Sequence, residues 1–247
     1  MEESVGVGAT TSLLAELLEC CIHAVLHARG VYPASVFERR RCLGVAVMKA
    51  RHPRLVEYIA DACEGVKEML GRGQLLALAV VVLGKGKGAA HVPLERIVFK
   101  IEMHGKRKEE QQQQHTSQRN ELEEEEEEEE EEDDVYEHAC TSLRAVLAKI
   151  GISGALLSRQ QPKDVETFEL VAYTNDRRAG TGIESTSRAG GRYLSADNKL
   201  DWVMEDARLG RVVIDEPKTV PIKSVLVGRT KIDVYAEQHA RDGGAVK

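Results

Sequence analysis

The sequence predicts a domain of mixed helix and sheet, in which amphipathic helices cover a central β-hairpin. Residues 75–83 are nine apolar side chains in a row. That is too few for a membrane-spanning helix, which needs about 20, and it is typical of a strand buried on both faces. A glycine-rich turn follows, and residues 96–102 then alternate partly between polar and apolar. Helical spacing of apolar residues at 13–26, 53–70 and 136–150 predicts the cover.

Composition divides the chain into a mildly basic part and one acidic run. The 247 residues are 42% hydrophobic, enough for one sizeable core, and their formal net charge is -7. Residues 123–134 are ten glutamates and two aspartates, so removing their -12 from -7 leaves +5 for the rest. Mild basicity alone does not predict nucleic-acid binding. Because no stripe of basic and aromatic residues accompanies it, direct binding to nucleic acid is not expected.

The cysteines and the N-terminus predict an intracellular protein. Glu2 and Glu3 stand where a signal peptide would be basic, and we expect neither a membrane-spanning segment nor a membrane partner. No C-x-x-C pair is present, so neither a zinc site nor a disulfide framework follows. We therefore expect small buried hydrophobic side chains in a reducing compartment at Cys20, Cys21, Cys42, Cys63 and Cys140.

The first third of the chain predicts two helices with a short strand between them. Residues 1–11 are small and polar, and we expect them to be disordered. The first helix runs from Leu13 and ends at Gly30. Residues 37–41 predict a turn or a short helix, and residues 43–48 a strand. The second helix opens at Pro53, which favours a first helical turn, and ends at Gly71.

Behind the hairpin, residues 105–134 form a low-complexity insertion that we expect to be disordered or partly helical. The insertion interrupts one domain, because the helix at 136–150 needs the preceding sheet to cover its apolar stripe. Residues 167–173 alternate like a strand, and residues 175–192 look mobile. The tail predicts two strands separated by Gly228.

Motifs for catalysis are missing, which favours a binding protein over an enzyme. Glu19, His23 and His27 have a spacing that could hold a metal ion, but a zinc protease needs glutamate where Ala24 stands. A solvent-exposed polar face is favoured there. The lysines of residues 84–88 precede a strand, and no serine or threonine follows them, so a phosphate loop is not predicted. We expect no metal and no cofactor.

The ordered segments, taken together, resemble the HORMA-domain family, and most of all its branch of accessory subunits of translesion DNA polymerase zeta. The resemblance covers residues 12–104 and 135–240 and rests on GVYPASVFERRR, HPRLVEYIADACEGVKEML, SLRAVLAKI, TFELVAYT, LDWVMED and VPIKSVLVGRTKIDVYAEQHA. It implies a single α+β domain at 12–240, with three helices packed on an antiparallel sheet. It also implies a mobile C-terminal "safety belt" at 195–240, followed by a disordered tail at 241–247.

In this family the belt closes over an extended partner peptide, which adds to the edge of the sheet by main-chain hydrogen bonds. The resemblance therefore implies a non-catalytic adaptor. It would bridge a peptide of the catalytic subunit of DNA polymerase zeta to the C-terminal domain of a Y-family polymerase. The process is translesion DNA synthesis, in the nucleus and also in the cytoplasm. The alternative within the family is an adaptor of the spindle assembly checkpoint or of the meiotic chromosome axis.

The resemblance also assigns roles to single residues. On the residues alone, Tyr58 predicts a half-buried ring and Trp202 a core side chain, but both match the aromatic pair that grips the partner peptide. Three residues match the belt surface that receives the inserter polymerase, although the first two differ from those usual in the family: Thr219, Asp233 and Tyr235. Three more match the surface that pairs with a second HORMA domain, of the same or another chain: Arg144, Lys149 and Ala155.

Overall fold

The computed structural model describes most of the chain. The described residues are 3–86, 91–103, 137–153, 157, 164–175, 189–196, 199–204, 214 and 216–239. For residues 3–7, 9, 189–196, 199–204 and 239 the description is of the backbone alone. The predicted insertion at 105–134 and the tail at 241–247 lie outside these residues.

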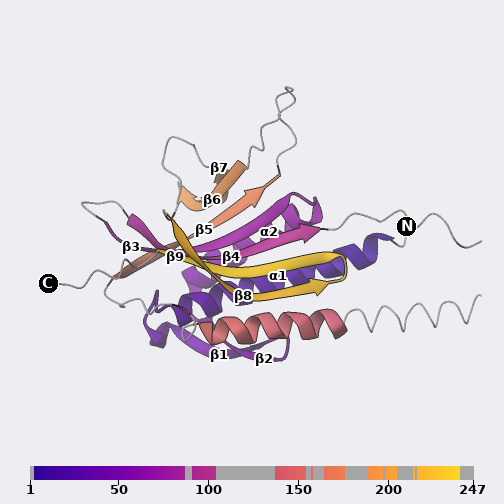
Figure 1. Cartoon of the computed structure of the whole chain (residues 1–247), viewed down its shortest axis with the longest axis horizontal. Coiled ribbons are helices and arrows are strands. Elements are labelled where there is room, and N and C mark those ends of the chain that lie inside the picture. The colour runs from indigo at the N-terminus through magenta and orange to yellow at the C-terminus, as the bar shows by residue number, and fades with distance from the viewer. Residues whose placement is uncertain are drawn as a thin grey trace, which may run out of the picture.

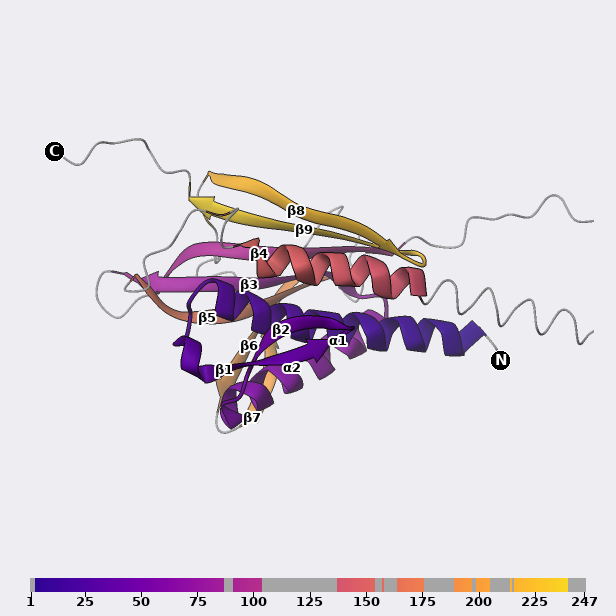
Figure 2. The same cartoon turned by 90° about the horizontal axis from the view of Figure 1, so that it is seen from below.

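The described residues form an antiparallel seven-stranded sheet with three helices on one face, so the predicted α+β class is confirmed (Figure 1 and Figure 2). The strand order is β7-β6-β5-β3-β4-β9-β8. The helices are α1 (Glu3–Ala28), α2 (Pro53–Gly71) and a third helix at residues 137–151. The strands are β3 (Leu75–Lys85), β4 (His91–Met103), β5 (Val165–Thr174), β6 (Ala189–Ala196), β7 (Lys199–Met204), β8 (Pro217–Val227) and β9 (Thr230–His239).

Strand β3 lies at the centre of the sheet and is buried on both faces, as its unbroken apolar run predicts. Leu78, Val80 and Val82 point to the helices and belong to the main core. Ala79 and Val81 alternate with them and face the opposite side of the sheet. The predicted hairpin of β3 and β4 is confirmed, with β4 longer than predicted at its N-terminal end.

Helix α1 is the central helix of the core, and its predicted apolar stripe is buried throughout. The stretch Thr10–Ala28 is long and apolar enough to cross a membrane, which the sequence analysis overlooked, but in the domain its side chains are mostly buried. The helix ends as predicted, because Val31 N–H bonds to Leu26 carbonyl around Gly30 at φ 65°. It begins at Glu3, so the expected disorder of residues 1–11 is wrong from Glu3 onward. Once the buried half has formed a helix, adding turns costs little.

Residues 37–41 are not a turn or short helix but part of a strand, β1 (Phe37–Cys42), which follows a 3₁₀ turn, η1 (Ala34–Val36). It pairs with β2 (Val45–Ala50), the strand predicted near residues 43–48, in a separate two-stranded sheet. The two-residue turn at Leu43 and Gly44 has φ values of 48° and 78°, the positive angles of a type I′ hairpin. The sequence did not predict this strand, because its three consecutive arginines interrupt the alternation of polar and apolar residues that is expected of a strand.

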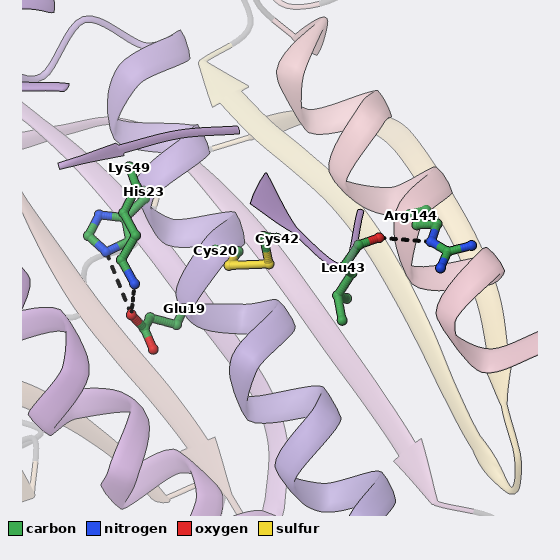
Figure 3. The surroundings of a disulfide bond; sticks show 7 residues. All are labelled: Glu19, Cys20, His23, Cys42, Leu43, Lys49 and Arg144. Atoms are coloured by element: carbon green, nitrogen blue, oxygen red, sulfur yellow. Dashed lines mark hydrogen bonds and ion pairs between the residues drawn. A yellow bond between two sulfur atoms is a disulfide. The ribbon is translucent and has the colours of Figure 1, made fainter. Parts of the chain in front are cut away.

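One cysteine prediction is wrong, because Cys20 of α1 and Cys42 of β1 form a disulfide (Figure 3). Their Cα atoms lie 6.6 Å apart although 22 residues separate them in sequence. Cys21, Cys63 and Cys140 are buried thiols, as expected. The disulfide ties the end of β1 to the central helix, a pairing that no spacing rule in the sequence indicates.

The C-terminal part of the chain supplies both edges of the sheet. Residues 175–192 look mobile in sequence, but their last four belong to β6, which pairs with β5 and β7. Strands β8 and β9 form the predicted hairpin and pair with β4. Because β7 and β8 are the two outermost strands, the connection at 205–216 joins opposite edges of the sheet.

Candidate functional site

A pocket of about 630 Å³ opens between the start of α2, the start of β5 and the turn η1. Its floor is aromatic. The ring of Phe168 meets Tyr58 edge to face at 5.7 Å between centroids, and Tyr32 in the same way at 6.2 Å. Tyr58 is half-buried, while Phe168 on β5 is 8% exposed. Edge-to-face rings of this kind are a favourable arrangement, which helps to hold the three side chains in place.

The position of Tyr58 follows from the stripe of α2. Leu55, Ile59 and Ala62 face the core, and Tyr58 lies beside them, where its ring closes one side of the pocket. Tyr32 comes from the segment after α1, and burial raises the pKa of its hydroxyl. Sequence reasoning found Tyr58 but not Tyr32 or Phe168, because only the folded chain brings the three elements together.

One edge of β5 runs along this pocket and is only partly covered. The ladder between β5 and β6 extends from Val171 to Thr174. Over residues 165–168 none of the described strands pairs with that edge, and Thr167 and Phe168 line the pocket there. A partly uncovered edge beside an apolar pocket suits an extended peptide, because main-chain bonds hold the peptide while alternate side chains enter the pocket.

The rim of the pocket is polar. His52 and Arg54, at the start of α2, are exposed, and His91 lies 3.3 Å from the carboxylate of Glu166. Apolar floor, polar rim and a strand edge are features of a recognition site for a polypeptide.

The structure brings the strand that carries Trp202 against the helix that carries Tyr58. Strand β7 packs on α2, and its backbone places Trp202 opposite Tyr193 of β6. The side chain of Trp202 lies outside the described residues. The aromatic pair therefore stays a prediction, although the two elements that would carry it are neighbours.

The three residues of the predicted second-partner surface share the face of the β8–β9 hairpin that is turned away from the helices. Thr219 is exposed and opposite Glu237, while Asp233 and Tyr235 alternate along β9. Hydrogen bonds from Lys231 Nζ at 2.8 Å and from Ser224 lower the pKa of Asp233. Tyr235 packs against the sheet, and burial raises its pKa. The surface thus combines an exposed hydroxyl, a fixed carboxylate and a phenol.

The predicted dimer residues are less closely grouped. Arg144 is exposed, and its Nε donates a 2.8 Å hydrogen bond to the carbonyl of Leu43, in the turn between β1 and β2 (Figure 3). Lys149 is exposed too, but five residues along a helix correspond to about 140° around its axis. Both side chains belong to the exposed side of the third helix, and the dimer surface stays a prediction. Ala155 lies outside the described residues.

His23 does not lie on a polar solvent face, as the sequence predicted, but is fully buried. Its Nδ1 accepts a hydrogen bond from the backbone of Ala50, and its Nε2 lies 3.9 Å from Glu19, which is paired with Lys49 at 2.7 Å (Figure 3). Burial first, and Lys49 second, lower the pKa of His23 to about 4. His27 contacts Phe37 edge to face instead of joining them. Within the described residues no cluster has the arrangement of a metal site.

Sequence reasoning also missed a buried ion pair on β4, on the other side of the central strand β3. Arg29, after α1, bonds through both Nε and Nη2 to the carboxylate of Glu95 in β4, with 2.7 Å between Nη2 and Oε2. Gln238 of β9 donates to the same oxygen at 2.7 Å. Glu95 is 0% exposed. The triad links the central helix, the sheet and the last strand, and nothing in the sequence shows that these three residues meet.

The sequence profile of the HORMA domain matches residues 10–179. This chain belongs to the HORMA-domain family. The match includes α1, α2, the central strands and the pocket with Tyr58 and Phe168. The expected family is therefore confirmed, and with it the general role of an adaptor that binds partner peptides.

Curated relatives include members of two named groups. The mitotic spindle assembly checkpoint protein MAD2B of Gallus gallus is 27% identical over 231 residues, which cover 94% of this chain and 92% of that protein. The human MAD2B is 26% identical over the same coverage. The DNA polymerase zeta processivity subunit of Arabidopsis thaliana is 37% identical over 99 residues, or 40% of this chain and 43% of that protein.

Solved structures agree on the fold. A chain of the mitotic checkpoint complex superposes with a TM-score of 0.64 and 16% identity, covering 94% of this chain and 99% of that chain. HTP-2 of C. elegans, bound to a HIM-3 closure motif, gives 0.58 and 12%, covering 94% and 91%. At these identities the likeness shows the architecture alone.

Proposed function

We propose that this protein is a non-catalytic adaptor that holds an extended partner peptide along β5 and under its C-terminal belt. The partner peptide would come from the catalytic subunit of DNA polymerase zeta. The face of the β8–β9 hairpin that is turned away from the helices would receive the C-terminal domain of a Y-family polymerase. Translesion synthesis then takes place in the nucleus, with a further pool of the protein in the cytoplasm.

One observation carries the proposal: among the described strands, none pairs with the outer edge of β5 at residues 165–168, where it borders the apolar pocket. An added strand of partner peptide would bond to residues 165–168 and insert alternate side chains toward Tyr58 and Phe168. The strands before and after residues 205–216, β7 and β8, are the outermost strands of the sheet, which supports a belt that crosses such a peptide. Release then requires the belt to open, which makes dissociation slow.

The polymerase assignment rests on the Arabidopsis relative, whose name links it to DNA polymerase zeta. The names of the MAD2B relatives favour a second candidate, an adaptor of the spindle assembly checkpoint, with the meiotic chromosome axis as a related alternative. Affinity capture from damaged and undamaged cells distinguishes them. Recovery of checkpoint proteins without the polymerase catalytic subunit would favour the second candidate.

Two single substitutions test the two proposed surfaces separately. Tyr58→Ala or Trp202→Ala should weaken binding of a peptide from the polymerase catalytic subunit by at least ~2 kcal/mol, as for a buried aromatic anchor. Calorimetry measures the affinity. Tyr235→Ala is the matched control, since it removes an aromatic side chain from the other face of the sheet.

The control should leave the peptide affinity unchanged and weaken capture of the Y-family domain instead. Equal peptide affinity in wild type, Tyr58→Ala and Trp202→Ala would reject the proposed peptide site. Equal losses in all three variants would indicate general damage to the fold and also argue against it.

A further inference from the structure

Strand β1 is a strand whose two ends are fixed and whose middle is exposed. Phe37 packs on His27 of α1 at 5.2 Å between ring centroids, and Cys42 is bonded to Cys20 of the same helix. Between them Arg39, Arg40 and Arg41 are exposed. The strand is therefore held extended without help from its central side chains.

Two of the three arginines are not neutralised by the described residues. Arg40 bonds to Glu38 at 2.7 Å, but neither Arg39 nor Arg41 forms an ion pair within the described part of the chain. They alternate along β1, so both lie on one side of the hairpin. Their cross-strand neighbours on β2 are Met48 and Ala46, which carry no charge.

The backbone of β1 also has an outer edge that could pair with an added strand. Strand β1 pairs with β2 on one side, and within the described residues no strand pairs with it on the other. Strand β2 makes the more extensive contact with α1, which leaves β1 on the outer side of the hairpin. At its end Arg144 bonds to Leu43 and steadies the turn.

We propose that the outer edge of β1 binds an acidic, extended segment of a partner protein. Such a segment adds a third strand to the hairpin by main-chain hydrogen bonds. Acidic side chains at every second position then lie opposite Arg39 and Arg41, which are about 7 Å apart along the strand. The required pattern is therefore acidic-x-acidic.

Arginines on a strand edge discourage pairing with apolar strands of other molecules. The same charges admit an acidic strand, so the edge is selective and not merely blocked. A polypeptide fits better than a nucleic acid, because the edge presents main-chain donors and acceptors and because Glu38 lies among the arginines. No residue of β1 lines the pocket with Tyr58.

The proposal is tested with a fluorescent eight-residue peptide of alternating threonine and glutamate, measured by anisotropy at low salt. The double variant Arg39→Gln and Arg41→Gln should weaken its binding to the full chain at least tenfold. Both side chains are exposed and form no ion pair with the described residues, so the fold should tolerate the change. The matched control is Arg72→Gln and Arg229→Gln, which removes the same charge from exposed positions elsewhere and should weaken binding less than twofold.

Hydrogen exchange gives an independent measure, because strand addition should protect backbone amides of residues 37–42 and a diffuse charge attraction should not. Titrations are repeated on a chain whose residues 123–134 are changed to glutamine and asparagine, since those acids can compete with the probe. Tyr58→Ala should leave probe binding unchanged, which separates this proposal from the proposed function.

Four results would overturn the proposal. They are equal losses in the two double variants, binding without amide protection, equal binding of a lysine version of the peptide, and no arginine-dependent binding in either parent chain. Tighter binding of a 20-base-pair DNA through Arg39 and Arg41 would identify a phosphate-binding surface and overturn it as well.

Discussion

The two sides of the seven-stranded sheet are fastened differently. On one side β9 pairs with β4 through nine residue pairs, and the buried triad of Arg29, Glu95 and Gln238 closes the end of that ladder. On the other side β6 pairs with β5 through four residue pairs, and the rest of that edge borders the pocket. Within the described residues, β9 is therefore held on β4 by a longer ladder and a buried ion pair, whereas β6 is held on β5 by a short ladder alone.

Ion pairs on the surface do not explain how β9 is held on β4. Lys100, Glu102, Lys231 and Asp233 form a ladder of ion pairs across β4 and β9, but their side chains are partly exposed. Exposed pairs contribute about 0–1 kcal/mol each. The buried triad differs because its members are withdrawn from water, so losing one charge of the Arg29–Glu95 pair leaves the other charge buried without that partner.

The largest expected effect comes from breaking the attachment of β9 to β4. Glu95→Ala leaves the buried guanidinium of Arg29 without its carboxylate, and we expect a loss of about 3–5 kcal/mol in the free energy of unfolding. Urea denaturation measures it. Hydrogen exchange should show that amides of β9 lose protection relative to those of β6.

Glu102→Ala is the control for this prediction, since its carboxylate is partly exposed, and it should lower the free energy of unfolding far less than Glu95→Ala does. Replacing both charges, as Arg29→Met with Glu95→Leu, should be milder than Glu95→Ala alone. If Glu95→Ala and Glu102→Ala prove equally stable, the triad does not hold β9 on β4.

Acidification tests how α1, the central helix of the core, contributes to the stability of the whole domain. The folded-state pKa of His23 is about 4, lowered from 6.5 by burial and by Lys49, so the folded protein resists its protonation. The stabilisation is fully present above pH 6.5 and is lost as the pH falls toward 4. We expect up to about 3 kcal/mol of stability to disappear over that window.

His23→Gln removes this titration, so its stability should depend less steeply on pH than that of the wild type. Urea denaturation of both proteins at several pH values between 4 and 7 gives the difference. Because His23 lies in α1 and belongs to neither edge, amides of β6 and β9 should lose protection together. Parallel pH profiles for the two proteins would contradict the role of His23.

The periodicity of apolar residues and the placement of glycine and proline predicted those helices and strands that local sequence determines. The stripes of α1 and α2, their endings at Gly30 and Gly71, and the buried run of β3 follow from periodicity and from glycine and proline placement. Strand β1 did not follow, because pairing with β2 and anchoring by Cys42 override a sequence that looks like a polar loop.

The residues of the candidate site also divide into those that the sequence predicted and those that it did not. Tyr58 was found because the family resemblance singles it out, whereas Phe168 and Tyr32 were missed because only tertiary packing brings them to Tyr58. The triad of Arg29, Glu95 and Gln238 was missed for that reason too. A single sequence contains no signal for contacts between residues 66 and 143 positions apart.

The smallest expected effect concerns the edge of β5 that we propose as the binding site of the partner peptide. Gly84 ends the β3–β5 ladder opposite Val165, and a Cβ there would lie 2.5 Å from the carbonyl oxygen of Asp164 and 2.8 Å from Leu94 Cδ1. Gly84→Ala should therefore cost about 2 kcal/mol, within the range for overpacking, measured by urea denaturation. The start of β5 must also shift, so the affinity for the partner peptide should fall with it.

Gly71→Ala is the matched control for this change, because an added Cβ at that helix end meets nothing within 4 Å. It should leave stability equal or slightly higher, as alanine favours a helix more than glycine does. If Gly84→Ala lowers stability but not peptide affinity, the start of β5 is not part of the peptide-binding edge, and the contrast between the two sides of the sheet would then rest on the four-residue ladder of β6 alone.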